Sequence, residues 1–138
     1  MMAGSKSDFL EGAYLNAFFR GSATPIQGTV FVGLWKAALD DASTGSAADE
    51  VSGTGYNRAT VVCNSTNWSL ASGGTVSNAA AISFGTAGAD WGTVTHLAVL
   101  SANSAGNIFY WADLTASKII QNGDPVQINV GDLVISES

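Results

Sequence analysis

His96 is the only histidine of the chain, and it is the first residue to consider for catalysis. It lies in the apolar, β-branched run 94–99, which predicts a strand. A histidine general base needs a hydroxyl or thiol within hydrogen-bond reach and a carboxylate behind the ring. Asp90, Asp113 and Cys63 offer those groups, but no local motif brings them to the ring. We therefore interpret His96 as a structural or interface residue, and we expect no catalytic residues and no enzymatic activity.

Two pairs of neighbouring acidic residues, Asp40-Asp41 and Asp49-Glu50, raise the question of a cation site. Neighbours in an extended chain do not face a common ligand, and neither pair has the alternating oxygen ligands and glycine of a calcium loop. A single histidine also excludes most zinc sites. We expect residues 38–55 to form a long solvated loop without a bound metal.

The tract Gly-Thr-Gly at residues 53–55 has the composition of a phosphate-binding loop. Such a loop is followed by a lysine and the start of a helix. Here residues 56–60 continue as a strand instead. The tract therefore predicts a glycine-rich turn that leads into a strand, and no cofactor is expected.

Large aromatic residues could stack on sugars or fill a core. The four tryptophans are Trp35, Trp68, Trp91 and Trp111. In a small β domain such rings usually fill the core or a subunit interface, where they bury a large area. Trp91 follows the glycine-rich segment 85–90 in a predicted loop, so it packs either on its own domain or on a partner subunit.

The charge content of the chain is low. Charged residues make up 12% of the sequence and hydrophobic residues 46%, whereas an average soluble domain is about 25% charged. This composition favours a protein that is packed against neighbouring chains. The net charge of −6 and the pI near 4.3 argue against nucleic acid or an anionic membrane as a partner.

The length of 138 residues predicts a single domain, residues 1–138, with one core. Cys63 is the only cysteine, so no internal disulfide is possible, and the preceding Val61 and Val62 predict a buried thiol in a strand. The first six residues lack the apolar run of a signal peptide. We therefore expect synthesis in a cytoplasm.

Residues 7–20 are predicted to form the one amphipathic helix. Its apolar side chains recur with helical spacing and are Phe9, Leu10, Ala13, Tyr14, Ala17 and Phe18. Ser7 or Asp8 can cap its start, Glu11 can complete a capping box with Asp8, and Gly21 can end it.

After residue 28 the apolar period changes from about four to two, which predicts strands. Residues 30–35 are apolar on both sides, so this strand needs two covers, one of which is the helix or a neighbouring subunit. Further strands are predicted at 56–63, 67–71, 79–84, 94–101, 107–113, 117–121, 125–130 and 132–136. Because no second helix is available for parallel crossovers, the fold class is mainly β, an antiparallel, jelly-roll-like β-sandwich with one N-terminal amphipathic helix.

The order of these motifs resembles a family of small tailed-bacteriophage virion proteins, the phage tail fibre or Gp80-like tail fibre adaptor proteins. The resemblance is carried by the Ser-Asp-Phe-Leu-Glu helix start, the strand at 30–35, the Glu-Val-Ser-Gly-x-Gly-Tyr-x-Arg tract, an Asn-x-Ala-x-Ile-x-Phe segment, Trp-Gly-Thr-Val-Thr-His, and the Gly-Asn and Gly-Asp elements. These lie at 7–11, 50–58, 78–84, 91–96, 106–107, 123–124 and 130–133.

The resemblance implies a non-enzymatic virion structural protein, made in the host cytoplasm, that assembles in multiple copies as a tail or tail-fibre adaptor. Its partners would be copies of itself and other tail or capsid proteins. A capsid decoration protein is one alternative; a phage-surface carbohydrate-binding module that stacks sugars on Trp35, Trp91 or Trp111 is another. The candidate interface residues are Phe9, Tyr14, Phe18, Trp35, Trp91 and His96.

Overall fold

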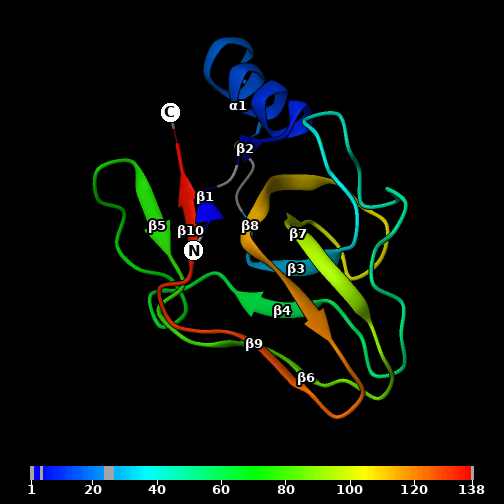
Figure 1. The fold of residues 1–138 in the computed structure, drawn as a ribbon. Helices are drawn as coiled ribbons and strands as arrows, with labels where there is room; N and C mark the ends of the chain where they lie inside the picture. The colour runs from blue at the N-terminus through cyan, green and yellow to red at the C-terminus, as the bar shows by residue number, and fades with distance from the viewer. Residues whose placement is uncertain (1, 4, 24–26, 138) are drawn as a thin grey trace.

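The chain is built mainly from antiparallel strands, with one helix near the N-terminus (Figure 1). The computed structural model describes residues 2–3, 5–23 and 27–137. Its elements are β1 (Met2–Ala3), β2 (Ser5–Lys6), α1 (Asp8–Arg20), β3 (Thr29–Trp35), β4 (Ala59–Val62), β5 (Thr75–Ser77), β6 (Ile82–Thr86), β7 (Gly92–Leu100), β8 (Ile108–Ile120), β9 (Pro125–Ile128) and β10 (Leu133–Ser136). The predicted fold class is confirmed.

Three sheets form the β body. The largest has the strand order β2-β8-β7-β3-β4, and its pairs are antiparallel. A second sheet has the order β1-β10-β5, with β1 parallel to β10, and β6 pairs with β9 in a third. Side chains from β6 and β10 join those of β3, β7 and β8 in one core cluster, which gives a sandwich-like arrangement.

The strand β3 is covered on both faces, as its sequence predicts. Val30, Val32 and Leu34 belong to the large core cluster. Trp35 belongs to a second, smaller cluster on the other side of the sheet, together with Leu39. The sheet therefore separates two cores, and the second one needs its own cover.

That second cover is part of the segment after β3. Residues 38–55 form a loop that is mostly exposed, as predicted, but the expectation that the whole loop is solvated is wrong. Leu39 is buried in the smaller core, and Ala47 packs against that core. Val51 is also buried, but in the large core cluster. The indole N–H of Trp35 donates to the backbone carbonyl of Ala47 at 3.2 Å. Because β3 is apolar on its outer face and no second helix is available, this loop covers the face in place of a helix or a neighbour.

Two strand predictions also differ from the structure. Residues 67–71 form no strand; Trp68 makes only an isolated bridge to Asn78. The side chain of Asn64 accepts from the backbone N–H groups of Thr66 and Asn67, and this local turn competes with sheet pairing. The predicted strands 107–113 and 117–121 are one long strand, β8, because β7 pairs with it on both sides of the predicted break.

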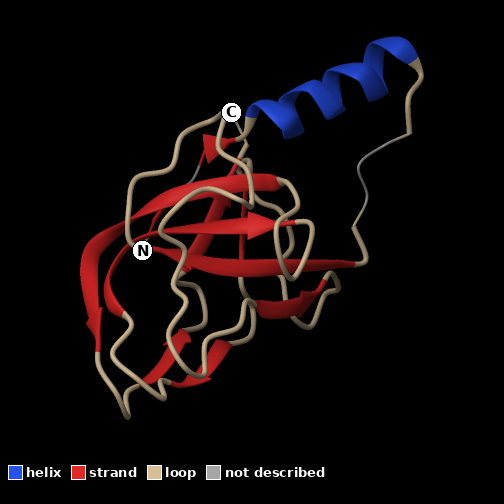
Figure 2. Ribbon diagram, turned by 90° about the vertical axis from the view of Figure 1, so that its right-hand side faces the viewer, coloured by secondary structure: helices blue, strands red, loops and turns tan. Residues whose placement is uncertain are grey.

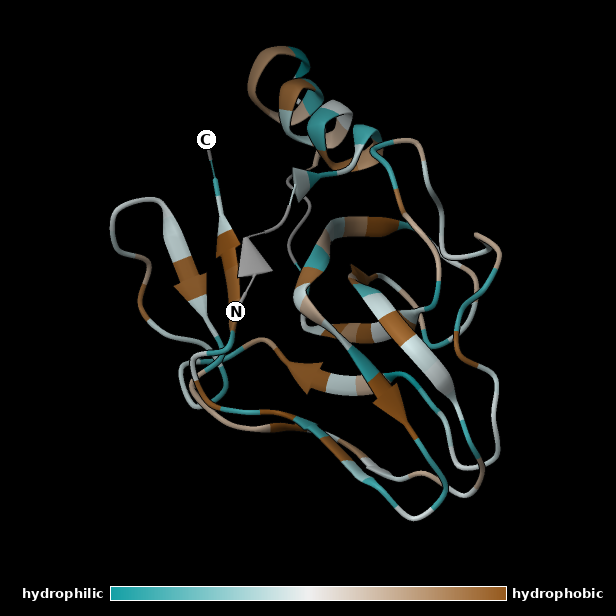
Figure 3. Ribbon diagram, viewed as in Figure 1, coloured by the Kyte–Doolittle hydropathy of each residue, from teal (hydrophilic) through white to brown (hydrophobic). Residues whose placement is uncertain are grey.

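The helix α1 begins and ends as predicted. The Ser7 hydroxyl accepts from the N–H of Leu10 at 3.2 Å, and Gly21 ends the helix in the left-handed conformation, with φ of 70°. Only Leu10 is fully buried. Figure 2 shows the helix pointing away from the β body, and Figure 3 shows apolar residues in its outer turns.

Candidate functional site

The tract at residues 50–58 forms a buried polar network. Arg58 is 5% exposed and pairs with both carboxylate oxygens of Glu50, from Nε and Nη2, at 2.8 Å each. Its remaining N–H groups donate to the backbone carbonyls of Gly45, Ala102 and Ala105 at 2.8–2.9 Å. These contacts can satisfy all five guanidinium donors. Arg58, which directly precedes β4, therefore binds both the loop that contains Gly45 and the loop that contains Ala102 and Ala105.

Tyr56 extends this network to β3. Its hydroxyl donates to Glu50 at 2.8 Å and accepts from the backbone N–H of Leu34 at 3.0 Å. Burial raises the pKa of Tyr56 above its ordinary value, and the hydrogen bond to Glu50 adds to the increase. The polar groups of Glu50, Tyr56 and Arg58 form hydrogen bonds with one another and with nearby backbone groups. We therefore interpret the network as structural.

The two loops joined by Arg58 also touch directly. The backbone N–H of Gly45 donates to the carbonyl of Gly106 at 2.9 Å. A Cβ atom at position 45 would lie 1.8 Å from the carbonyl oxygen of Ala105. Only glycine fits at this contact.

Two predicted interface residues, Trp35 and Trp91, are buried within the chain at 0% and 2% exposure. The Trp91 indole donates to the backbone carbonyl of Thr54 at 3.0 Å, and its ring meets that of Tyr56 edge-on. Trp91 thus packs on its own chain. In this structure neither Trp35 nor Trp91 offers its ring to a partner or a sugar.

His96 lies beside a carboxylate and a hydroxyl. Its Nε2 is 2.6 Å from Oδ1 of Asp113, its cross-strand partner, and its Nδ1 is 2.8 Å from the Thr95 hydroxyl. Of the carboxylates considered from the sequence, Asp113 is therefore the one brought to the ring. Asp113 is exposed, and His96 does not line the apolar cleft described below.

Polar contacts hold the base of the helix to the C-terminal strand. Lys6 pairs with Glu137 at 2.7 Å, and the Tyr110 hydroxyl donates to the same carboxylate. Burial alone would raise the pKa of Glu137, but the hydrogen bonds from Lys6 and Tyr110 lower it overall. The hydrogen bond to Glu137 in turn raises the pKa of Lys6. The Lys6 ammonium also lies over the ring of Tyr14, a predicted interface residue that is half-buried.

Beyond its base, α1 exposes large apolar side chains. Leu15 is 59% exposed, Phe18 is 80% exposed and Phe19 is 83% exposed. These three residues, called the outer helix face below, follow the i, i+3, i+4 spacing of one helix face. Phe9 is 48% exposed and also contacts the ring of Phe109 at 6.0 Å between centroids.

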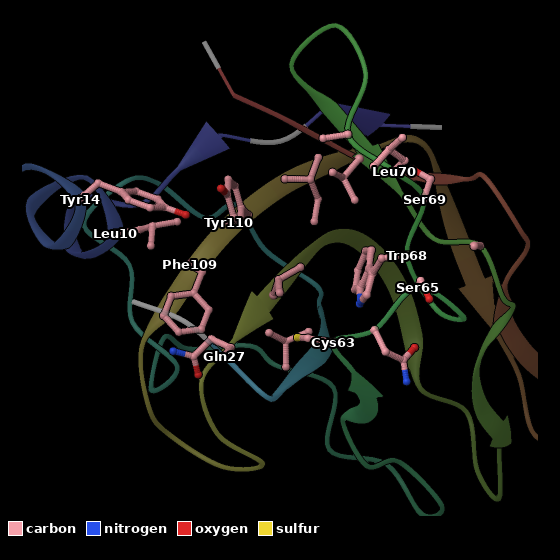
Figure 4. A pocket seen from close by; sticks show the side chains of 17 residues that line it. Leu10, Tyr14, Gln27, Cys63, Ser65, Trp68, Ser69, Leu70, Phe109 and Tyr110 are labelled. Carbon is pink, nitrogen blue, oxygen red and sulfur yellow. The ribbon is translucent and has the colours of Figure 1, made fainter. Parts of the chain in front are cut away.

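An open apolar cleft of about 830 Å³ lies between the helix base and the segment 63–71 (Figure 4). Leu10 and Tyr14 lie at one end, with Phe109 and Tyr110 beside them, and Trp68 and Leu70 at the other. The remaining residues that line it are Gln27, Val30, Cys63, Asn64, Ser65, Ser69, Ala71, Val76, Ala79, Val99 and Ile135. None of them is charged.

Three features of the cleft wall stand out. The indole N–H of Trp68 is buried and has no hydrogen-bond acceptor among the described residues. Cys63, predicted to be buried in a strand, is exposed because β4 ends at Val62. Leu70 is 92% exposed, so it offers almost its whole side chain to an added group.

A comparison with protein families decides the identity. The family model described as podophage GP4 fiber I protein gp80 matches residues 5–136. The chain belongs to this family. It is thus a phage tail fibre protein, and its family implies a place in the virion in association with other phage proteins. None of the curated proteins compared with this fibre protein matches it.

Two further findings describe the fibre protein. Within the part of the chain that the structure describes, no helix combines the length and the apolar character needed to cross a bilayer. Among the same residues, no group of three or more His, Cys, Asp and Glu side chains could hold a metal ion.

The six predicted interface residues do not form one surface. Phe9, Tyr14 and Phe18 lie on α1, whereas the other three lie in the β body, two of them buried. Sequence reasoning missed Leu15, Phe19 and Leu70, which are among the most exposed apolar residues of the fibre protein. The spacing of Leu15, Phe18 and Phe19 was the available signal, because residues at i, i+3 and i+4 share one helix face.

Proposed function

We propose that this fibre protein is a non-enzymatic adaptor that joins copies of itself and a larger tail protein by protein–protein contacts. The observation that carries the proposal is the outer helix face, which leaves Leu15, Phe18 and Phe19 exposed on a helix that points away from the β body. Exposed large apolar groups of this kind mark interaction sites. Family membership and the low charge content support the same function.

The surroundings of His96 support a structural role over a catalytic one. Its ring nitrogens contact Asp113 and Thr95, and this arrangement lies on a sheet surface outside the apolar cleft. A nucleophile acting on a substrate also needs donors that stabilise the developing charge. We expect His96→Ala to affect packing between β7 and β8 and to leave no activity to lose.

Sugar stacking is the weaker candidate. Trp35 and Trp91 are buried, and the half-buried Trp111 donates its indole N–H to Asp41 at 2.9 Å. A stacking platform needs an exposed ring face. No observation in the described residues favours this function over an adaptor.

Location and copy number in the virion test the proposal. Purified particles would be examined by electron microscopy with a labelled antibody against this chain, and its copies would be counted by quantitative mass spectrometry. We expect label at the tail and a copy number far below that of the capsid protein. Label over the whole capsid with a near-equal copy number would instead establish a decoration protein, and absence from particles would overturn both.

A further inference from the structure

The outer helix face cannot be covered by the cleft of its own chain. The first turn of α1 is anchored, because the Ser7 hydroxyl donates to the backbone carbonyl of Ile108 and the N–H of Asp8 donates to the backbone carbonyl of Asp41. A rise of 1.5 Å per residue places Phe18 about 12 Å beyond the buried Leu10 along the helix axis. The helix points away from the β body (Figure 2), so Phe18 would reach its own cleft only if the helix unwound.

The cleft and the outer helix face match in chemistry. All side chains that line the cleft are uncharged, and residues 12–19 of the helix carry no charge either. Apolar surfaces without charge can meet without stranding an ion in a dry interface. The buried N–H of Trp68 has no acceptor among the described residues, so the cleft wall holds one unsatisfied donor.

We propose that the outer helix face of one copy packs into the cleft of a second copy of this chain. The proposal rests on the proposed self-association and specifies its contact. Because the two surfaces are different, the contact is heterologous, and each copy both gives a helix and receives one. Repetition of such a contact produces a closed ring or an open string of copies, depending on the rotation between neighbours.

The available area fits a weak contact that each copy makes twice. An aromatic side chain buries roughly 150–250 Å² when it is fully covered. Because Phe18, Phe19 and Leu15 are 80%, 83% and 59% exposed, they supply about 400 Å² on the helix side. One contact would then bury about 800 Å² in total, which is the size of a weak, transient interface. Each copy takes part in two such contacts, one through its helix and one through its cleft, so closure of a ring adds avidity that a single contact lacks.

Two complementary variants test the contact. The double variant Phe18→Ser/Phe19→Ser removes the helix anchor, and Leu70→Asp places a charge in the cleft; all three side chains are at least 80% exposed, so the fold should persist. Ile119→Asp, on an exposed residue of β8 outside this cleft, is the matched control. Sedimentation velocity would measure association at concentrations up to about 1 mM, where even a millimolar-Kd contact is half formed.

The expected pattern is specific to a heterologous contact. The wild-type chain and Ile119→Asp should associate, while each contact variant alone should lose at least about tenfold in affinity. A mixture of the two contact variants retains one intact helix and one intact cleft, so it should form a 1:1 heterodimer that grows no further. A helix-to-helix contact would instead leave Leu70→Asp fully associated and give no heterodimer.

Cys63 provides a second readout, since it is the only cysteine and lines the cleft. In the variant Phe18→Cys, a short bis-maleimide should join position 18 of one copy to Cys63 of another. Tryptic mass spectrometry of isotope-mixed copies distinguishes this link from one within a chain. Ile119→Cys should give no comparable product.

Either of two results would overturn the proposal: a wild-type chain that stays monomeric at 1 mM, or cross-links formed only within one chain. Such results would leave the virion experiment untouched, because an adaptor could still bind a different tail protein. Conversely, absence from virions would overturn the proposed function while the self-association data stood. The two failures are therefore distinguishable.

Discussion

The network around Arg58 and the surface made by α1 and the cleft use side chains in opposite ways. In the network, charged and polar groups are buried, and Arg58 makes five hydrogen bonds inside the chain. On the helix, apolar groups are exposed and contact little of the chain. Fully paired buried groups rigidify a fold, whereas uncovered apolar groups stabilise only when a partner arrives. One region maintains the fold, and the other is the surface that we propose for assembly.

The largest effect is expected for Arg58→Ala. The substitution removes five hydrogen bonds and leaves the Glu50 carboxylate without its charged partner, which should cost about 3–5 kcal/mol of unfolding free energy. Urea denaturation followed by tryptophan fluorescence would measure it. Arg58→Lys keeps the charge but loses the two-point pairing with Glu50. Its unfolding free energy should therefore lie between those of the wild type and Arg58→Ala. A loss below about 1 kcal/mol for Arg58→Ala would mean that the network does not maintain the fold.

A smaller loss is expected for Tyr56→Phe, which removes one hydroxyl and leaves the N–H of Leu34 unpaired. The cost should be about 1–3 kcal/mol at neutral pH. Because the folded-state pKa of Tyr56 is raised above 10.0, its contribution is complete below that pH and falls as the pH rises further. The gap between wild type and variant should therefore narrow in alkaline solution. A gap that widens there would contradict this assignment.

Glu137→Gln should have a weaker and pH-dependent effect. The lowered pKa of Glu137 means that its contribution is present above the ordinary value of 4.5 and is lost as the pH falls through the folded-state value. The raised pKa of Lys6 means that its contribution is present below 10.5 and is lost at higher pH. Between pH 4.5 and pH 10.5 the variant should lose less than about 1 kcal/mol of unfolding free energy, since the Lys6–Glu137 pair is partly exposed. Thermal unfolding against pH would show equal stabilities in strong acid.

The smallest effect on stability is expected for Phe18→Ser/Phe19→Ser. Both side chains are at least 80% exposed, so the unfolding free energy of the dilute, monomeric chain should change by no more than about 0.5 kcal/mol. Chemical denaturation at low protein concentration would measure it. A loss above about 2 kcal/mol would show that the outer helix face supports its own fold, and the contrast between the two regions would disappear.

Local patterns in the sequence predicted much of the fold. The caps of α1 and the two-sided burial of β3 depend on neighbouring residues, so spacing alone revealed them. The covering loop was missed because Leu39 and Val51 are isolated apolar residues in a polar stretch. Leu39 is buried in the smaller core and Val51 in the large core cluster, so the burial of each depends on tertiary contacts.

The site was less predictable for a related reason. The sequence shows Glu50 and Arg58 only as turn and strand residues. Their network is not visible there, because the three backbone carbonyls that Arg58 binds lie 13 to 47 positions away in the chain. Trp35 and Trp91 were expected to be able to reach a partner, yet hydrogen bonds to Ala47 and Thr54 hold their indoles inside. The cleft itself joins residues from Leu10 to Ile135, a juxtaposition that no local motif encodes.

The fit at Gly45 limits how this fibre protein can vary. Since a side chain there would collide with the carbonyl of Ala105, any substitution at position 45 would force apart the two loops that meet there. At Gly73 a Cβ would meet no atom within 4 Å, although the φ of +60° still favours glycine. A tag for locating the chain on a particle should therefore be tolerated better in the turn around Gly73 than at the contact of Gly45.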